Sequence, residues 1–114
     1  MFEGTLIAES LRAGTTLDSI PLTVRKIARH RPAYSIADQP PIWTNIEFEV
    51  ADDEADALAS ALSAALDRPG WYADFRSAEW IYIVFPGRVF RYLRGNGPGQ
   101  AQAQATSLVP RALP

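Results

Sequence analysis

The stretch that decides the fold is residues 42–70, IWTNIEFEVADDEADALASALSAALDRPG, in which the hydrophobic period changes once. Residues 42–50 alternate between apolar and polar, which predicts a half-buried strand with one solvent-exposed face. The aspartates that follow can cap a helix, and Leu58, Leu62 and Leu66 then recur every four residues. This spacing predicts an amphipathic helix, which the Pro-Gly pair at the end of the stretch terminates.

Short strands are expected on both sides of this helix. Two precede the first strand named above, and three follow the helix as a meander. They are predicted over residues 2–11, 20–29, 71–76, 80–85 and 88–94. The segment 80–85 is apolar on both faces, as in a central strand that is covered on both sides. The sequence therefore predicts an α+β fold with a mainly antiparallel sheet, in the order β-β-β-α-β-β-β.

The domain is expected to end near residue 94. Residues 1–94 carry the strand and helix patterns of one α+β domain. Residues 95–114 are rich in Gly, Ala and Gln, which indicates a flexible C-terminal segment or a short helix.

Composition excludes several chemistries. The chain has 114 residues, 11 Lys and Arg against 13 Asp and Glu, and no Cys. Without cysteine there is no disulfide, no thiol nucleophile and no Cys-based zinc site. A net charge of −2 gives no electrostatic reason to expect nucleic acid or an anionic membrane as the main partner. The longest apolar run is far shorter than a membrane span, and residues 1–5 lack a basic signal-peptide start, so we expect a cytoplasmic protein.

No catalytic, metal or cofactor site is expected from the motifs. His30 is the single histidine, and Arg29 and Arg31 on either side of it would repel a metal ion. No serine lies in a G-x-S-x-G elbow. The Gly-rich residues 95–99 lack the Lys and Ser or Thr of a phosphate-binding loop.

A polar strand face is the best candidate for a ligand site. Tyr72, Asp74 and Arg76 point the same way from an extended strand. With Glu79 or Arg91 beside them, they could bind a small polar ligand or position an acid–base pair. An exposed ladder of cross-strand ion pairs is the alternative interpretation of the same residues.

Charge and one aromatic residue suggest partners. An acidic block at residues 47–56 contrasts with two basic segments, 25–31 and 88–94, and we expect these charges to pair locally or across a homodimer. Trp43 lies on the solvent-exposed face of its strand and needs a partner, which suggests an interface. Basic and aromatic residues alternate in the last segment, which leaves single-stranded nucleic-acid binding as a further alternative. That alternative would use Arg88, Phe90, Arg91, Tyr92 and Arg94.

Three segments resemble a family of short uncharacterised bacterial proteins, found in actinobacteria with relatives in firmicutes. They are EGTLIAESL at residues 3–11, GWYADF at 70–75 and IVFPGRVFRY at 83–92. The family has no assigned activity, so the resemblance implies no catalytic residues. Residues 107–114 differ from the sequence with which members of the family usually end.

From these observations we expect a non-enzymatic binding or protein-interaction module of the bacterial cytoplasm, acting as a homodimer or with a small protein partner. The alternatives are a small-molecule-binding protein or weak enzyme that uses the Tyr72 strand face, and the nucleic-acid binder described above.

Overall fold

The computed structural model describes residues 1–33, 39–68 and 70–94. Within these residues the strands are β1 (Phe2–Ile7), β2 (Thr23–His30), β3 (Trp43–Val50), β4 (Ala73–Arg76), β5 (Trp80–Phe85) and β6 (Arg88–Leu93). The helix α1 (Ala55–Ala65) lies between β3 and β4, and short 3-10 turns occur at η1 (Ala8–Ser10) and η2 (Asp52–Glu54). The α+β class and the predicted order of elements are confirmed. The predicted C-terminal helix or tail lies outside the described residues.

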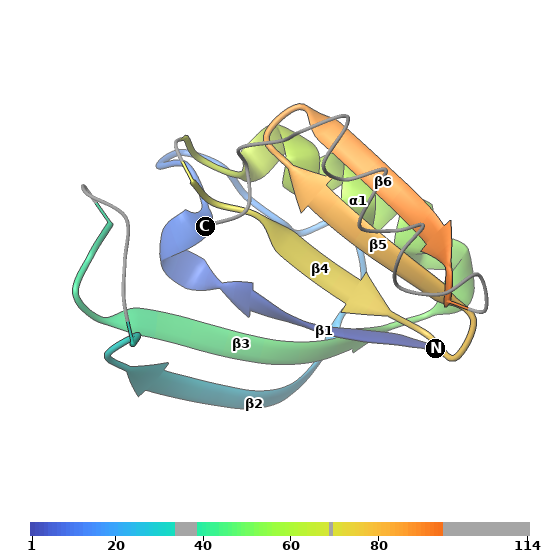
Figure 1. Ribbon diagram of the computed structural model, residues 1–114, viewed down its shortest axis with the longest axis horizontal. Helices are drawn as coiled ribbons and strands as arrows, with labels where there is room; N and C mark the ends of the chain where they lie inside the picture. Colours follow the sequence, from blue (N-terminus) through green and yellow to red (C-terminus); the bar gives the residue numbers. More distant parts are fainter. Residues whose placement is uncertain (34–38, 69, 95–114) are drawn as a thin grey trace.

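The first strand lies in the middle of the sheet. The strand order is β2-β3-β1-β4-β5-β6, and every neighbouring pair is antiparallel. Figure 1 shows β1 between β3 and β4, so it joins the β2–β3 hairpin to the C-terminal meander. The two halves of the chain therefore form one sheet because β1 pairs with both of them.

A glycine permits the close approach of β1 and β4. Gly4 pairs with Phe48 on one side and with Phe75 on the other. A Cβ atom at this position would lie 2.5 Å from the carbonyl oxygen of Asp74 and 2.6 Å from the Cβ of Phe75. Residues with a side chain are thus excluded where the two halves of the sheet meet.

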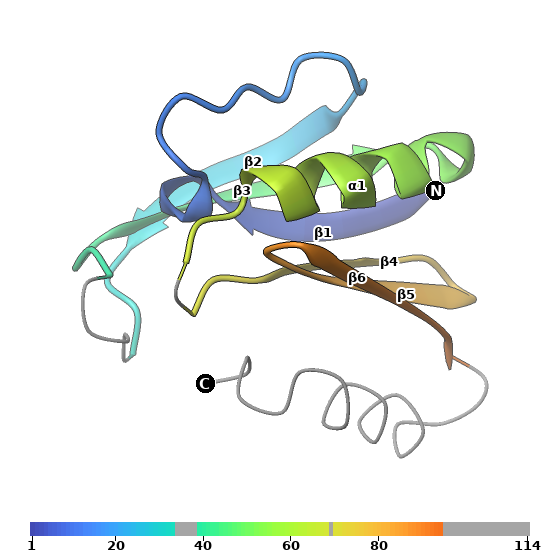
Figure 2. The same ribbon diagram turned by 90° about the horizontal axis from the view of Figure 1, so that it is seen from above.

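The core lies between α1 and one face of the sheet. Figure 2 shows α1 running along β1 on one side of the sheet. The helix contributes Leu58, Leu62 and the adjacent Leu66, each 1% exposed. The sheet contributes Phe2, Leu6, Phe48, Val50, Phe75, Tyr82 and Val84. Strands of alternating pattern and a helix of four-residue spacing thus bury their apolar sides against each other.

The strand β5 is apolar on both faces, as its sequence predicts. Tyr82 and Val84 are buried in the core beside α1. The alternation of strand side chains places Ile81, Ile83 and Phe85 on the opposite face. On that face Phe85 is 3% exposed while Ile81 and Ile83 are half-buried, so the second side of the strand is partly covered.

Several element boundaries differ from the sequence prediction. The first strand ends at Ile7, because η1 turns the chain before Leu11, and the second strand begins at Thr23. The helix ends at Ala65, because the next residue, Leu66, adopts an extended ψ of 138° and forms an isolated bridge with Leu11. The end of the helix thus depends on a partner distant in sequence, which the local pattern does not report.

The segregated charges pair within the chain. Arg25 lies 2.8 Å from Glu49 and Lys26 lies 3.9 Å from Glu47, both across the β2–β3 hairpin. Arg91 of β6 lies 4.0 Å from the Asp56 carboxylate on α1. The expected local pairing of the acidic block with both basic segments is confirmed. Among the described elements, no helix is long and apolar enough to cross a membrane.

Candidate ligand-binding site

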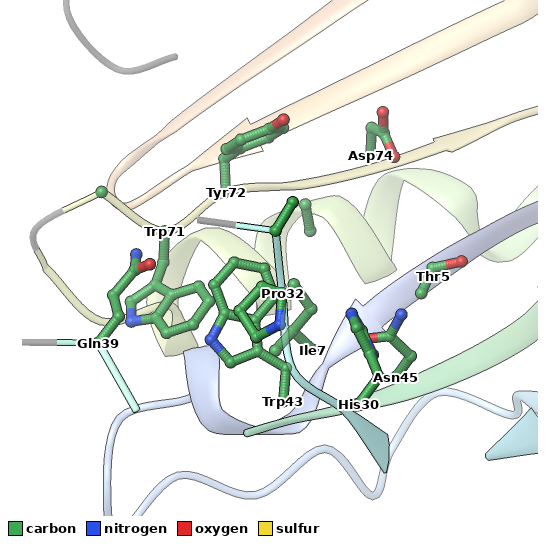
Figure 3. A pocket seen from close by; sticks show the side chains of 13 residues that line it. Thr5, Ile7, His30, Pro32, Gln39, Trp43, Asn45, Trp71, Tyr72 and Asp74 are labelled. Carbon is green, nitrogen blue, oxygen red and sulfur yellow. The ribbon is translucent and has the colours of Figure 1, made fainter. Parts of the chain in front are cut away.

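A cavity of about 410 Å³ opens on the face of the sheet that α1 leaves uncovered. Leu6 and Phe75 belong to the core beneath α1, so their neighbours Thr5 and Asp74 point to the other face. Thr5 and Asp74 face each other across β1 and β4. The described residues that line the cavity are Thr5, Ile7, His30, Pro32, Ala33, Gln39, Trp43, Asn45, Gly70, Trp71, Tyr72, Ala73 and Asp74 (Figure 3).

Aromatic side chains form much of the wall. The ring centroids of Trp43 and Trp71 are 5.1 Å apart, with planes tilted by 56°. The ring of His30 meets Trp43 edge-on at 6.4 Å. The indole Nε1 of Trp43 donates a hydrogen bond of 3.1 Å to the carbonyl oxygen of Pro40, which fixes the ring. The wall is therefore held by contacts within the chain.

The helix-to-strand connection supplies the other wall. Gly70 has a φ of +85°, a left-handed conformation that lets the chain turn after α1. Trp71 follows at once and is 7% exposed, so it is anchored in the core while it also lines the cavity. Tyr72 comes next and packs on Phe85, with ring centroids 5.9 Å apart.

The cavity also contains an unsatisfied acceptor. The Oδ1 atom of Asn45 is buried and has no hydrogen-bond partner among the described residues. A buried polar atom without a partner costs roughly 1–3 kcal/mol, so such atoms are uncommon in folded proteins and can mark a place where a ligand or water binds. Asn45 pairs with Ile7 of β1, and both line the cavity.

Hydrogen bonds to the Glu9 carboxylate hold the start of β3 in place. The carboxylate accepts hydrogen bonds from the backbone N–H of Thr44 at 2.6 Å and from the Thr44 hydroxyl at 2.8 Å. Burial on its own would raise the pKa of Glu9, but these hydrogen bonds outweigh it and lower the pKa below 4.5. Because Thr44 lies between Trp43 and Asn45, this contact holds two cavity residues in place.

The structure divides the predicted polar site. Tyr72 and Asp74 line the cavity and project from the same side of the chain (Figure 3). Arg76 instead lines a second hollow of about 370 Å³, beside Glu3 and Arg25. The sheet twist and the spacing of two residues thus carry Arg76 away from the cavity.

The remaining predicted partners of this site lie elsewhere. Glu79 is exposed in the β4–β5 turn, where its carbonyl oxygen accepts a hydrogen bond from the N–H of Arg94. The Arg91 guanidinium lies 3.9 Å from the ring centre of Trp80. Arg91 pairs with Tyr82 on the face that α1 covers, opposite to Asp74. Neither residue lines the cavity.

The predicted nucleic-acid segment presents few free rings. Tyr92 is 5% exposed, and Phe90 packs edge-on against Phe85 with ring centroids 5.8 Å apart. Arg94 donates a hydrogen bond to the carbonyl oxygen of Ser77. Base stacking needs exposed rings, so these placements lend no support to single-strand binding by this strand.

For several residues of the cavity, the sequence predicts no role in a site. The sequence gives Thr5, Asn45 and Trp71 no functional signal, and the arginines on either side of His30 argue only against a metal role for it. The sequence offers one clue to this site. Asn45 comes two residues after Trp43, so both side chains point to the same face of a strand. No cluster of three or more His, Asp or Glu side chains suited to a metal ion occurs in the described part of the chain.

No protein-family model, curated protein or solved structure matches this chain. The resemblance to the bacterial family therefore stays a prediction.

Proposed function

We propose that this chain is a binding module whose ligand is a small molecule held in the aromatic cavity. The observation that carries the proposal is the buried Oδ1 of Asn45, which lacks a partner among the described residues and belongs to a residue that lines the same cavity as Trp43. An apolar wall with a few fixed polar groups is the usual make-up of a small-molecule site. Among the functions expected from the sequence, this proposal corresponds to the small-molecule-binding alternative.

The dimensions of the cavity support this assignment. Its volume of about 410 Å³ suits a ligand of one or two rings. Ligand pockets commonly measure about 300–1,000 Å³, so the cavity lies at the small end of that range. The rings of Trp43 and Trp71 offer apolar surface to a planar ligand, and Asn45 offers a hydrogen-bond acceptor.

The test is a fragment screen observed on ¹⁵N-labelled protein. We expect ring-containing fragments to shift the resonances of Asn45, Asp74 and the Trp43 indole together. Trp43→Ala should abolish these shifts, because it removes one wall of the cavity. Val89→Ala changes an exposed residue of β6 outside the cavity and should leave them intact. A screen in which no fragment shifts the cavity residues would contradict the proposal.

A second candidate is self-association through the outer strand β2. Val24 and Ile27 are 51% and 63% exposed although both are apolar, and β2 is an edge of the sheet. Exposed apolar side chains on an edge strand favour association with another chain. We propose a homodimer in which these residues meet their copies.

Light scattering coupled to size exclusion tests the dimer. The wild-type protein should elute as a dimer, and Ile27→Asp should elute as a monomer. Val89→Asp on the opposite edge strand is the matched control, because Val89 is 39% exposed, and should remain dimeric. A monomeric wild type across the concentration range would contradict the dimer and leave the cavity proposal unaffected.

A further inference from the structure

We infer that the cavity selects an organic cation, namely a protonated amine on a flat apolar body. This inference rests on the proposed small-molecule site and adds the charge of its ligand. It follows from the charges, acceptors and rings around the cavity.

The described lining of the cavity has one carboxylate and, besides the imidazole of His30, no basic side chain. Among the described residues that line it, Asp74 is the only acid, and no Lys or Arg is present. Asp74 forms no ion pair with any described residue, whereas Glu47, Glu49 and Asp56 are each paired. An unpaired carboxylate beside a low-dielectric wall favours a cationic ligand and disfavours an anionic one.

The uncharged polar groups point to the same ligand. The Oδ1 of Asn45 lies just beneath the cavity surface and can only accept a hydrogen bond, so a turn of this side chain toward the cavity would present it to a donor such as an ammonium N–H. The indole N–H of Trp43, which could have bound an anion, is already donated to the carbonyl oxygen of Pro40. Asp74 therefore offers the ligand a charged acceptor, while the indole donor of Trp43 is occupied.

The aromatic wall suits a cation as well. Indole rings attract cations through the negative potential of their faces, and Trp is the strongest of the aromatic residues in this respect. Trp43 and Trp71 lie next to each other in the wall, on the same cavity as Asp74 (Figure 3). The cluster of Arg side chains near His30 does not interfere, because neither Arg29 nor Arg31 lines the cavity.

The experiment compares ligands that share a body and differ in charge. Calorimetry and ¹⁵N NMR titration are run with tryptamine, N-acetyltryptamine and indole-3-propionate, and with the matched set benzylamine, benzyl alcohol and benzoate. We expect each amine to bind at least ten-fold more tightly than its neutral and anionic counterparts. Asp74→Asn should weaken amine binding about five- to ten-fold and leave the neutral compounds unchanged, which corresponds to about 1–1.4 kcal/mol. Glu79→Gln removes an exposed acid outside the cavity and is the matched control.

The outcomes separate this inference from the proposed function. Neutral or anionic compounds that bind the cavity as tightly as the amines would overturn the charge selectivity and still support a small-molecule site. Amine binding that Asp74→Asn does not weaken would overturn the role of this carboxylate. No binding of any of the six compounds at the cavity would overturn the inference, and the broader fragment screen would then decide on the site itself.

Discussion

The indole rings of Trp43 and Trp71 lie 5.1 Å apart, centre to centre, although one opens β3 and the other follows α1. Their contact joins the β2–β3 hairpin to the start of the meander across the central strand β1. The same pair forms the wall of the cavity. One contact thus contributes both to the packing of the two halves and to the proposed site.

The two tryptophans should differ in their contributions to stability. Trp71 is 7% exposed and belongs to the core, so Trp71→Ala should cost about 3–5 kcal/mol in the free energy of unfolding. Trp43 is half-buried at the cavity, so Trp43→Ala should cost clearly less while it abolishes ligand binding. Urea denaturation followed by far-UV circular dichroism measures both values. Equal losses would show that Trp43 is mainly a core residue.

The Gly4→Ala substitution should destabilise the join between the two halves of the sheet. The added methyl group meets backbone and Cβ atoms of β4 at 2.5–2.6 Å, so the strands must move apart. We expect a loss of about 2–3 kcal/mol in urea denaturation, at the upper end of the usual range for overpacking.

Gly14→Ala provides the matched control for that prediction. Gly14 has a φ of +91°, but a Cβ atom added there would meet no other atom within 4 Å, so the substitution reports backbone strain without a clash. Its expected cost is about 1 kcal/mol. A Gly4 variant no less stable than the Gly14 variant would contradict the close approach of β1 and β4.

Two buried tyrosines should respond differently to loss of the hydroxyl group. Tyr82 donates a hydrogen bond from its hydroxyl to the Asp56 carboxylate, linking β5 to α1. Tyr82→Phe should therefore cost about 1–2 kcal/mol. The buried hydroxyl of Tyr92 has no partner among the described residues, so Tyr92→Phe should leave stability unchanged or increase it. Thermal unfolding of both variants measures the difference, and similar losses would contradict these assignments.

Stability should fall at alkaline pH through the same tyrosines. Burial, and then the hydrogen bond to Asp56, raises the pKa of Tyr82 above 10.0, and burial raises the pKa of Tyr92. Because these folded-state pKa values exceed those of the unfolded chain, the stability they contribute is complete below pH 10 and is lost as the pH rises through them. Urea denaturation between pH 9 and about 11.5 should show this fall, with a shallower slope in Tyr82→Phe. An identical slope would contradict the environment described for Tyr82.

Acid pH should weaken the fold through Glu9. The hydrogen bonds from Thr44 lower the pKa of Glu9 below 4.5, so this contribution is present above that pH and is lost as the pH falls through the folded-state value. Between about pH 5 and 3 the wild type should lose more stability than Glu9→Gln. Thr44→Val removes the hydroxyl donor and keeps the backbone donor, so its slope should be intermediate. Parallel curves for all three proteins would contradict the prediction.

Much of the fold follows from local pattern. The change of period within residues 42–70 predicts β3 and α1 closely, because alternation and four-residue spacing directly reflect which side chains face the core. The double-sided apolar pattern of residues 80–85 likewise predicts β5 inside the sheet. The central position of β1 could not be predicted, because its pairing with β4 depends on a close approach at Gly4 that has no local signature.

The site was predictable only in part. Tyr72 and Asp74 share a strand face, and this relation holds in any extended segment. The grouping of Asp74 with Thr5 and Asn45 requires the strand order β3-β1-β4, which the sequence does not contain as a pattern. The prediction that groups Arg91 with Asp74 is wrong, because the register of β5 and β6 places Arg91 on the opposite face. The pairing of strands that are distant in sequence therefore determines which residues line the cavity.

The structure of the protein with bound tryptamine offers the sharpest test of the proposed cavity. Tryptamine should lie against the Trp43 ring, with its ammonium group within hydrogen-bond distance of Asn45 Oδ1 or the Asp74 carboxylate. The partnerless Oδ1 atom would then gain the donor that it lacks among the described residues. An empty cavity at saturating tryptamine, or tryptamine bound elsewhere on the surface, would contradict the selection of an organic cation by this cavity.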